Sequence, residues 1–206
     1  WISYIKKHPV DVVTEKKRAV PLEHRFYDDE RGFATLDEIA KWKKLDEYPK
    51  YHQAFKMRKK MLDEAMRRKK RSFMELLRDL ENEKALPTIY FCFSRLLTQK
   101  KAEALQSKKN YLTSKESMIV AKLIREKIDA ADPAVRSLRT TQLLRECLQK
   151  GIAFHHAGVL AVLKELVEEL FSAGFVKVLF ATETFAVGIN MPAKTVCFDS
   201  LEKFDG

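Results

Sequence analysis

One short segment of the sequence concentrates polar side chains of the kind that bind ligands. It holds two hydroxyls, a carboxylate, a carboxamide and a glycine: Thr182, Glu183, Thr184, Asn190 and Gly188. An apolar run, Val176–Phe180, precedes this segment, and a second run, Thr195–Phe198, follows it. Such runs are typical of buried parallel strands. Because open α/β sheets bind ligands at the turns that follow the carboxyl ends of such strands, the pattern predicts a binding site here.

Strands and helices are predicted to alternate along the rest of the chain. Further strands are predicted at Val10–Val13, Ile89–Phe93 and Ile152–His155, and helices at Leu96–Leu105 and Leu160–Ser172. This alternation indicates βαβ units with right-handed crossovers. The sequence therefore predicts an α/β fold built on a parallel sheet.

Two capping patterns predict where further helices begin. The spacing Thr113-x-x-Glu116 is that of a capping box, which predicts a helix through Ile128. Asp132 followed by Pro133 places a cap before a proline at the first helical position, which predicts a helix that ends at Gly151.

The segment Ala181–Ala193 resembles motif V of the superfamily two helicases, and in its full length that of the Ski-like (superkiller-type, exosome-associated) DExH-box RNA helicases. Three further stretches resemble the same family in the same order along the chain: Arg18–His24, Pro87–Arg95 as motif IV, and Gly151–Gly158. The resemblance implies the second RecA-like domain of such a helicase. Its expected fold is a RecA-like parallel sheet flanked by helices, a P-loop NTPase-type fold without the P-loop.

The resemblance also divides the chain into parts. Residues 1–27 are expected to begin the second RecA-like domain, and residues 86–206 to form its remainder, truncated before motif VI. Residues 28–85 are expected to be a basic helical insertion. In this family the arginines of motif VI stabilise charge on the γ-phosphate, and no QxxGRxGR-like run occurs in the sequence.

The family roles transfer to individual residues by their motif positions. The resemblance implies that Thr182 hydrogen-bonds an RNA phosphate. It also implies that Gly188 lets the backbone come close to the nucleotide or to the facing domain, and that Asn190 contacts the nucleotide ribose or links the two domains. The remaining residues implied to contact nucleic acid lie after the predicted strands, and they are Ser94, Arg95, His156 and Gly158. Without the resemblance, turn or cap roles are the usual explanation for residues of these types.

The groups that perform ATP hydrolysis are missing from this sequence. Phosphoryl transfer needs a glycine-rich cradle with a lysine and a carboxylate that holds magnesium, and no GxxxxGK[ST] run occurs among its six glycines. Asp63-Glu64 resembles a Walker B pair, but it follows basic residues instead of ending an apolar strand. We therefore expect no catalytic residue here, no activity of the chain alone, and ATP and Mg²⁺ bound mainly by a first RecA-like domain.

Composition and spacing indicate a soluble intracellular protein, expected in the cytoplasm instead of the nucleus. The three cysteines, Cys92, Cys147 and Cys197, lie in apolar surroundings without a CxxC pair, as reduced core thiols do. No apolar run is long enough to cross a bilayer. Because adjacent strand residues point to opposite faces, His155 and His156 are not expected to bind one metal ion.

The positive charge of the chain is concentrated in one segment. The net charge is +10, yet residues 41–71 hold 13 Lys and Arg against 4 Asp and Glu, whereas the rest holds 26 against 25. Residues 51–82 are predicted to form a long helix with one apolar face. The basic patch Arg67, Arg68, Lys69, Lys70 and Arg71 is predicted to bind phosphates. A solvated helix face and a protein-binding helix are the alternatives.

The function implied by the resemblance is that of an ATP-dependent RNA helicase, of which this chain supplies RNA-backbone contacts and part of the interdomain ATP site. The implied partners are single-stranded RNA, a first RecA-like domain in the same chain, and proteins of RNA decay or processing. Two alternatives stay open at this point: a DNA helicase of the same superfamily, and a nucleic-acid-binding scaffold that has lost catalysis.

Overall fold

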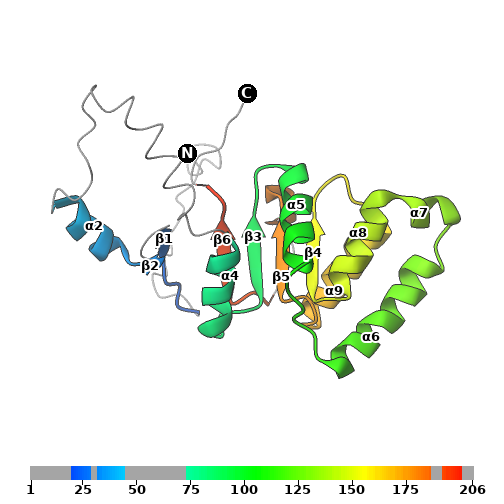
Figure 1. Ribbon diagram of the computed structural model, residues 1–206. Coiled ribbons are helices and arrows are strands. Elements are labelled where there is room, and N and C mark those ends of the chain that lie inside the picture. Colours follow the sequence, from blue (N-terminus) through cyan, green and yellow to red (C-terminus); the bar gives the residue numbers. More distant parts are fainter. Residues whose placement is uncertain (1–19, 29–31, 45–72, 187–191, 201–206) are drawn as a thin grey trace, which may run out of the picture. The chain divides into compact units, whose positions relative to one another are not determined.

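The computed structural model describes residues 20–28, 32–44, 73–186 and 192–200 (Figure 1). The chain divides into two compact units, Trp1–Leu76 and Leu77–Gly206. The predicted strand Val10–Val13 and the 51–72 part of the predicted long helix lie outside the described residues. The remaining part of that helix is present as α4 (Phe73–Asn82), which buries Leu77 and Leu80.

In the first unit a short hairpin precedes a helix. Strand β1 (Phe26–Asp28) pairs antiparallel with β2 (Gly32–Ala34), and helix α2 (Leu36–Lys44) follows. The Thr35 hydroxyl accepts from the Glu38 amide, and the Glu38 carboxylate accepts from the Thr35 amide, so a capping box begins α2. The sequence did not predict this hairpin, because its strands are too short to show an alternating pattern.

The second unit contains a parallel sheet of four strands. These are β3 (Thr88–Phe91), β4 (Ile152–His155), β5 (Val178–Ala181) and β6 (Thr195–Phe198), arranged in the order β4-β5-β3-β6. All three pairings are parallel, and helices flank the sheet (Figure 1). The α/β RecA-like fold expected from the sequence is confirmed.

Most of the helices in this unit lie where the sequence predicted them. Helix α5 (Arg95–Gln106) follows β3, and α9 (Ala161–Ser172) follows β4. The predicted capping box begins α6 (Ser114–Ile124), which continues into a π-helical turn, η1 (Arg125–Asp129). The Asp132 side chain caps α7 (Pro133–Ser137), as predicted.

The single helix predicted from Pro133 to Gly151 is wrong, because the structure contains two helices. Leu138 adopts an extended backbone (ψ 131°), which ends α7 and begins α8 (Arg139–Leu148). No glycine or proline marks the break, so local propensity gave no sign of it. The new helix buries Leu144, Cys147 and Leu148. The break therefore leaves the apolar face of α8 in the core.

The core lies around the two strands β4 and β5. Every residue of both strands is buried, as continuous apolar runs predict for strands covered on both faces. Helices α8 and α9 supply further fully buried side chains, among them Leu148, Leu166 and Phe171. Strand β6 is less covered, because its residues alternate between half-buried and exposed. Strands β4 and β5 are therefore the most completely buried strands of the sheet.

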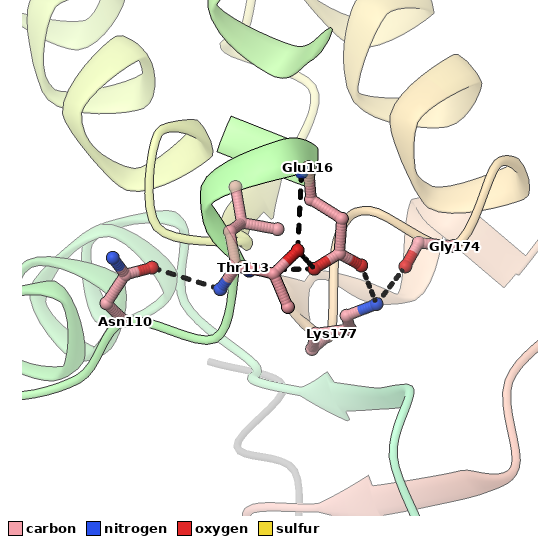
Figure 2. A network of polar contacts seen from close by, with 6 residues as sticks. Asn110, Thr113, Glu116, Gly174 and Lys177 are labelled. Atoms are coloured by element: carbon pink, nitrogen blue, oxygen red, sulfur yellow. Dashed lines mark hydrogen bonds and ion pairs between the residues drawn. The ribbon is translucent and has the colours of Figure 1, made fainter. Parts of the chain in front are cut away.

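A polar network fixes α6 to the start of β5 (Figure 2). Thr113 and Glu116 exchange capping bonds, since the Thr113 amide donates to the Glu116 carboxylate (2.8 Å) and the Glu116 amide donates to the Thr113 hydroxyl (3.3 Å). The Lys177 ammonium donates to Glu116 (3.0 Å) and to the Gly174 carbonyl (2.6 Å). The bond from the Thr113 amide, then the bonds from Lys177 and the Thr113 hydroxyl, lower the pKa of Glu116 to about 2.

Replacing Glu116 with alanine should therefore lower the free energy of unfolding at pH 7 by about 1 kcal/mol, the usual loss for a helix cap. The ion pair with Lys177 adds little, because solvent screens it. The folded-state pKa of Glu116 lies below its ordinary value of 4.5. The contribution is thus fully present above about pH 4.5 and disappears as the pH falls toward about 2.

Urea unfolding between pH 2 and pH 7 measures this difference. Glu126→Ala is the matched control, because Glu126 forms an exposed pair with Lys122 (3.8 Å) in the same helical segment. The control should change stability by less than about 0.5 kcal/mol. An equal loss in both variants, or a Glu116→Ala loss that is the same at pH 2 and pH 7, would contradict the assignment.

Candidate functional site

The carboxyl ends of three neighbouring strands form one edge of the sheet. In the register, Ala181 of β5 lies opposite Phe91 of β3 and His155 of β4. The amide of Cys92 donates to the Ala181 carbonyl (2.8 Å), and the amide of Thr182 donates to the His155 carbonyl (3.1 Å). The loops after β3, β4 and β5 therefore begin side by side. We call this the carboxyl edge.

The loop after β5 begins with the predicted phosphate ligand Thr182. Thr182 is 8% exposed, and its hydroxyl lies 3.0 Å from the hydroxyl of Thr184. A 3₁₀ turn, η2 (Glu183–Ala186), follows immediately, and the Phe185 amide donates to the Thr182 carbonyl (3.0 Å). The predicted residues Gly188 and Asn190 lie outside the described residues.

The loop after β4 is held by the ring of His156. This residue is 3% exposed, and its ring stacks on that of Phe154 with centroids 5.9 Å apart. Nδ1 accepts from the Gly158 amide (3.0 Å), and Nε2 lies 2.8 Å from the Gln99 carboxamide nitrogen. Because Nδ1 accepts a hydrogen bond, the proton of the neutral ring is on Nε2. Nε2 then donates to the carboxamide oxygen of Gln99, which requires that oxygen to face the ring.

The surroundings of the His156 ring explain both its protonation state and the presence of a glycine at position 158. Desolvation, followed by repulsion from Arg95, lowers the pKa of His156, so the ring is neutral at physiological pH. A Cβ at Gly158 would lie 3.2 Å from two atoms of the His156 ring. Glycine therefore lets the loop backbone close onto the ring. The ring of His156 thus holds the loop after β4 in place through its contacts with Phe154, Gln99 and Gly158.

The loop after β3 ends at Ser94, and Arg95 begins α5; both residues are exposed. Ser94 precedes α5 in an extended conformation, and its hydroxyl makes no capping bond. Leu160, before α9, also provides no side-chain cap. The positive dipole ends of α5 and α9 therefore lie at the carboxyl edge without a side-chain cap, and Arg95 is the first residue of α5. Such an arrangement favours anions.

Three residues of this edge were not singled out in the sequence: Gln99 on α5, Glu168 on α9 and Phe185 on η2. Gln99 contacts His156, while Glu168 and Phe185 both contact His155. None of them lies at a motif spacing that predicts its contact. Each contact forms only when the helices return to the sheet.

The described residues contain neither a metal-binding cluster nor a helix that could span a membrane. No three His, Cys, Asp or Glu side chains there come close enough together to hold a metal ion. No helix in the same part of the chain is both long and apolar enough to cross a membrane. The three thiols are free, and burial raises the pKa of Cys92 and of Cys147 to about 12.

The known proteins described here as similar to this chain are of one kind, namely helicases of the superkiller and exosome type. No family model matches the chain. Superkiller complex protein 2 of Mus musculus is 35% identical over 222 aligned positions, which cover the whole chain and 18% of that protein. The DExH-box ATP-dependent RNA helicase DExH10 of Arabidopsis thaliana is 34% identical, with the whole chain and 22% of the relative covered. The exosome RNA helicase MTR4 of Homo sapiens is 31% identical, with the whole chain and 20% covered. The chain thus spans about a fifth of the length of these relatives.

Proposed function

Because the chain belongs to the Ski-like DExH-box RNA helicases, we propose that it is the second RecA-like domain of such an enzyme and binds the backbone of single-stranded RNA at the carboxyl edge. The domain would comprise residues 1–27 and 86–206, with residues 28–85 as a basic insertion. The convergence of the three loops on one edge is the observation that carries this proposal.

The chemistry of the carboxyl edge suits phosphates. Arg95 supplies a positive charge, Ser94 and Thr182 supply hydroxyls, and the helices α5 and α9 supply uncapped N–H groups. Gly158 and His156 complete the edge by presenting the loop after β4. None of these groups distinguishes one base from another, so the contacts would be independent of sequence. Translocation along RNA requires contacts of that kind.

ATP and Mg²⁺ would bind mainly to a first RecA-like domain elsewhere in the longer protein, with Gly188 and Asn190 completing the site. Binding of ATP would close the two domains on RNA, and hydrolysis would reopen them. The names of two relatives refer to a superkiller complex and an exosome. We propose RNA-decay or RNA-processing proteins as partners of the longer protein, and the cytoplasm as its location.

Replacing Thr182 with alanine in the full-length protein tests the proposed contact. A hydrogen bond to a charged group contributes about 1.5–3 kcal/mol. The dissociation constant for single-stranded RNA should therefore rise by roughly ten-fold or more, and RNA-stimulated ATP hydrolysis should fall. Fluorescence anisotropy and phosphate release measure the two effects.

The matched control is Thr113→Ala, which removes a hydroxyl at α6, beside the amino end of β5 instead of its carboxyl end. It should lower thermal stability without changing RNA affinity. If Thr182→Ala binds RNA as the unchanged protein does, Thr182 is not a phosphate ligand. A parallel titration with single-stranded DNA of the same length compares the two nucleic acids, and tighter binding of DNA would favour a DNA helicase.

A further inference from the structure

The ring of His155 lies between a helix and the loop that carries Thr182. Its Nε2 is 3.0 Å from the Glu168 carboxylate on α9. Its ring meets the ring of Phe185 on η2 edge to face, with centroids 4.6 Å apart. His155 is 7% exposed and Phe185 is 3% exposed. The two rings are therefore buried against each other, and Glu168, whose side chain is partly exposed, reaches the His155 ring from α9.

The two nitrogens of this ring have different surroundings. Nε2 donates to the Glu168 carboxylate, which leaves Nδ1 as an acceptor in the neutral ring. Nδ1 is buried and finds no hydrogen-bond partner among the described residues. A buried acceptor without a donor destabilises the fold, and an apolar ring would avoid that loss. The histidine thus provides something at this position other than packing, and among the described residues its ring forms a hydrogen bond with Glu168 alone.

The contacts of His155 reach the predicted phosphate ligand by two routes. Its carbonyl accepts from the Thr182 amide (3.1 Å), and its ring holds Phe185, whose amide donates to the Thr182 carbonyl (3.0 Å). Thr182 is therefore fixed at its amide by the backbone of His155 and at its carbonyl by the residue on which that ring packs. A change in the orientation of the ring would move the start of η2, and with it the Thr182 hydroxyl.

We propose that His155 is a positioning residue for RNA binding. Glu168 orients the ring of His155, and this ring holds η2 so that the Thr182 hydroxyl faces a phosphate. The proposal rests on the RNA-binding function proposed for the carboxyl edge. His155 does not itself contact RNA, because its ring is enclosed between α9 and η2. Glu168 is the more informative residue to change, since its side chain is 32% exposed and its loss leaves the core packed.

The test is a double-mutant cycle between Glu168→Ala and Thr182→Ala in the full-length protein. Glu168→Ala alone should weaken binding of single-stranded RNA about five-fold, as expected when one orienting hydrogen bond is lost. In the Thr182→Ala background the same change should have almost no effect, because the hydroxyl that it positions is absent. Glu168→Gln keeps an acceptor oxygen for Nε2 and should restore the original affinity.

Glu169→Ala is the matched control, since Glu169 is the next residue on α9 and pairs only loosely with Lys127 (3.9 Å). It should leave RNA affinity unchanged. Equal losses from Glu168→Ala with and without Thr182, or no loss at all, would overturn the positioning role while the Thr182 contact stands. If Thr182→Ala alone has no effect on affinity, the RNA contact fails and the positioning role fails with it.

Discussion

The 206-residue chain by itself should hydrolyse ATP no faster than the uncatalysed background, even with saturating single-stranded RNA. The sequence contains no glycine-rich loop with a lysine to hold the phosphates. Phosphoryl transfer depends on that cradle and on a carboxylate that holds magnesium. Since enzymes accelerate such reactions by at least about 10⁶-fold, the expected loss is complete. Phosphate release from purified protein measures it.

The control for this measurement addresses the Walker B-like pair Asp63-Glu64. The variant Asp63→Asn with Glu64→Gln should behave as the unchanged chain does, because neither carboxylate is expected to hold magnesium. Turnover that survives repeated purification and disappears in this variant would assign catalysis to the pair. That result would also contradict the proposal that the chain is a second RecA-like domain.

Neutralising the basic patch should give the second large effect, on RNA binding by the full-length protein. Changing Arg67, Arg68, Lys69, Lys70 and Arg71 to glutamine removes positive charge from the segment that accounts for most of the net charge. Each lost phosphate contact on a single strand reduces the slope of log affinity against log salt by about 0.7. The slope should thus fall by up to about 3.5 if all of these residues contact phosphates.

The control removes the same charge from the second unit. Its five residues are exposed on or beside the helices of that unit, and they are Lys108, Lys115, Lys122, Arg125 and Arg136. This variant should change the salt slope much less, which separates local contacts from an effect of net charge. Unchanged slope and affinity in the patch variant would make the patch a solvated face or a protein contact. Replacing Phe55, Leu62 and Met66 then distinguishes these two, because a protein partner would contact the apolar face.

Local patterns in the sequence were sufficient to predict most elements of the sheet and its helices. Strands Ile152–His155 and Thr195–Phe198 have the predicted ends, because apolar runs of this length are local signals. The capping box at Thr113 is equally local, since its two residues lie on one helical turn. The motif resemblances depend on the same short stretches. The sequence alone therefore determined the family and the fold class, whereas β3 and β5 each end one or two residues away from the predicted position.

The tertiary structure decided how these residues meet. The order β4-β5-β3-β6 differs from the order along the chain, and it brings the loops of three strands to one edge. His156 is enclosed by Gln99 and Gly158, while His155 contacts Glu168 and Phe185. These contacts join residues on different elements, so no periodicity or spacing predicts them. They depend on which helix returns to which strand, and the free energy of packing the whole core determines that arrangement.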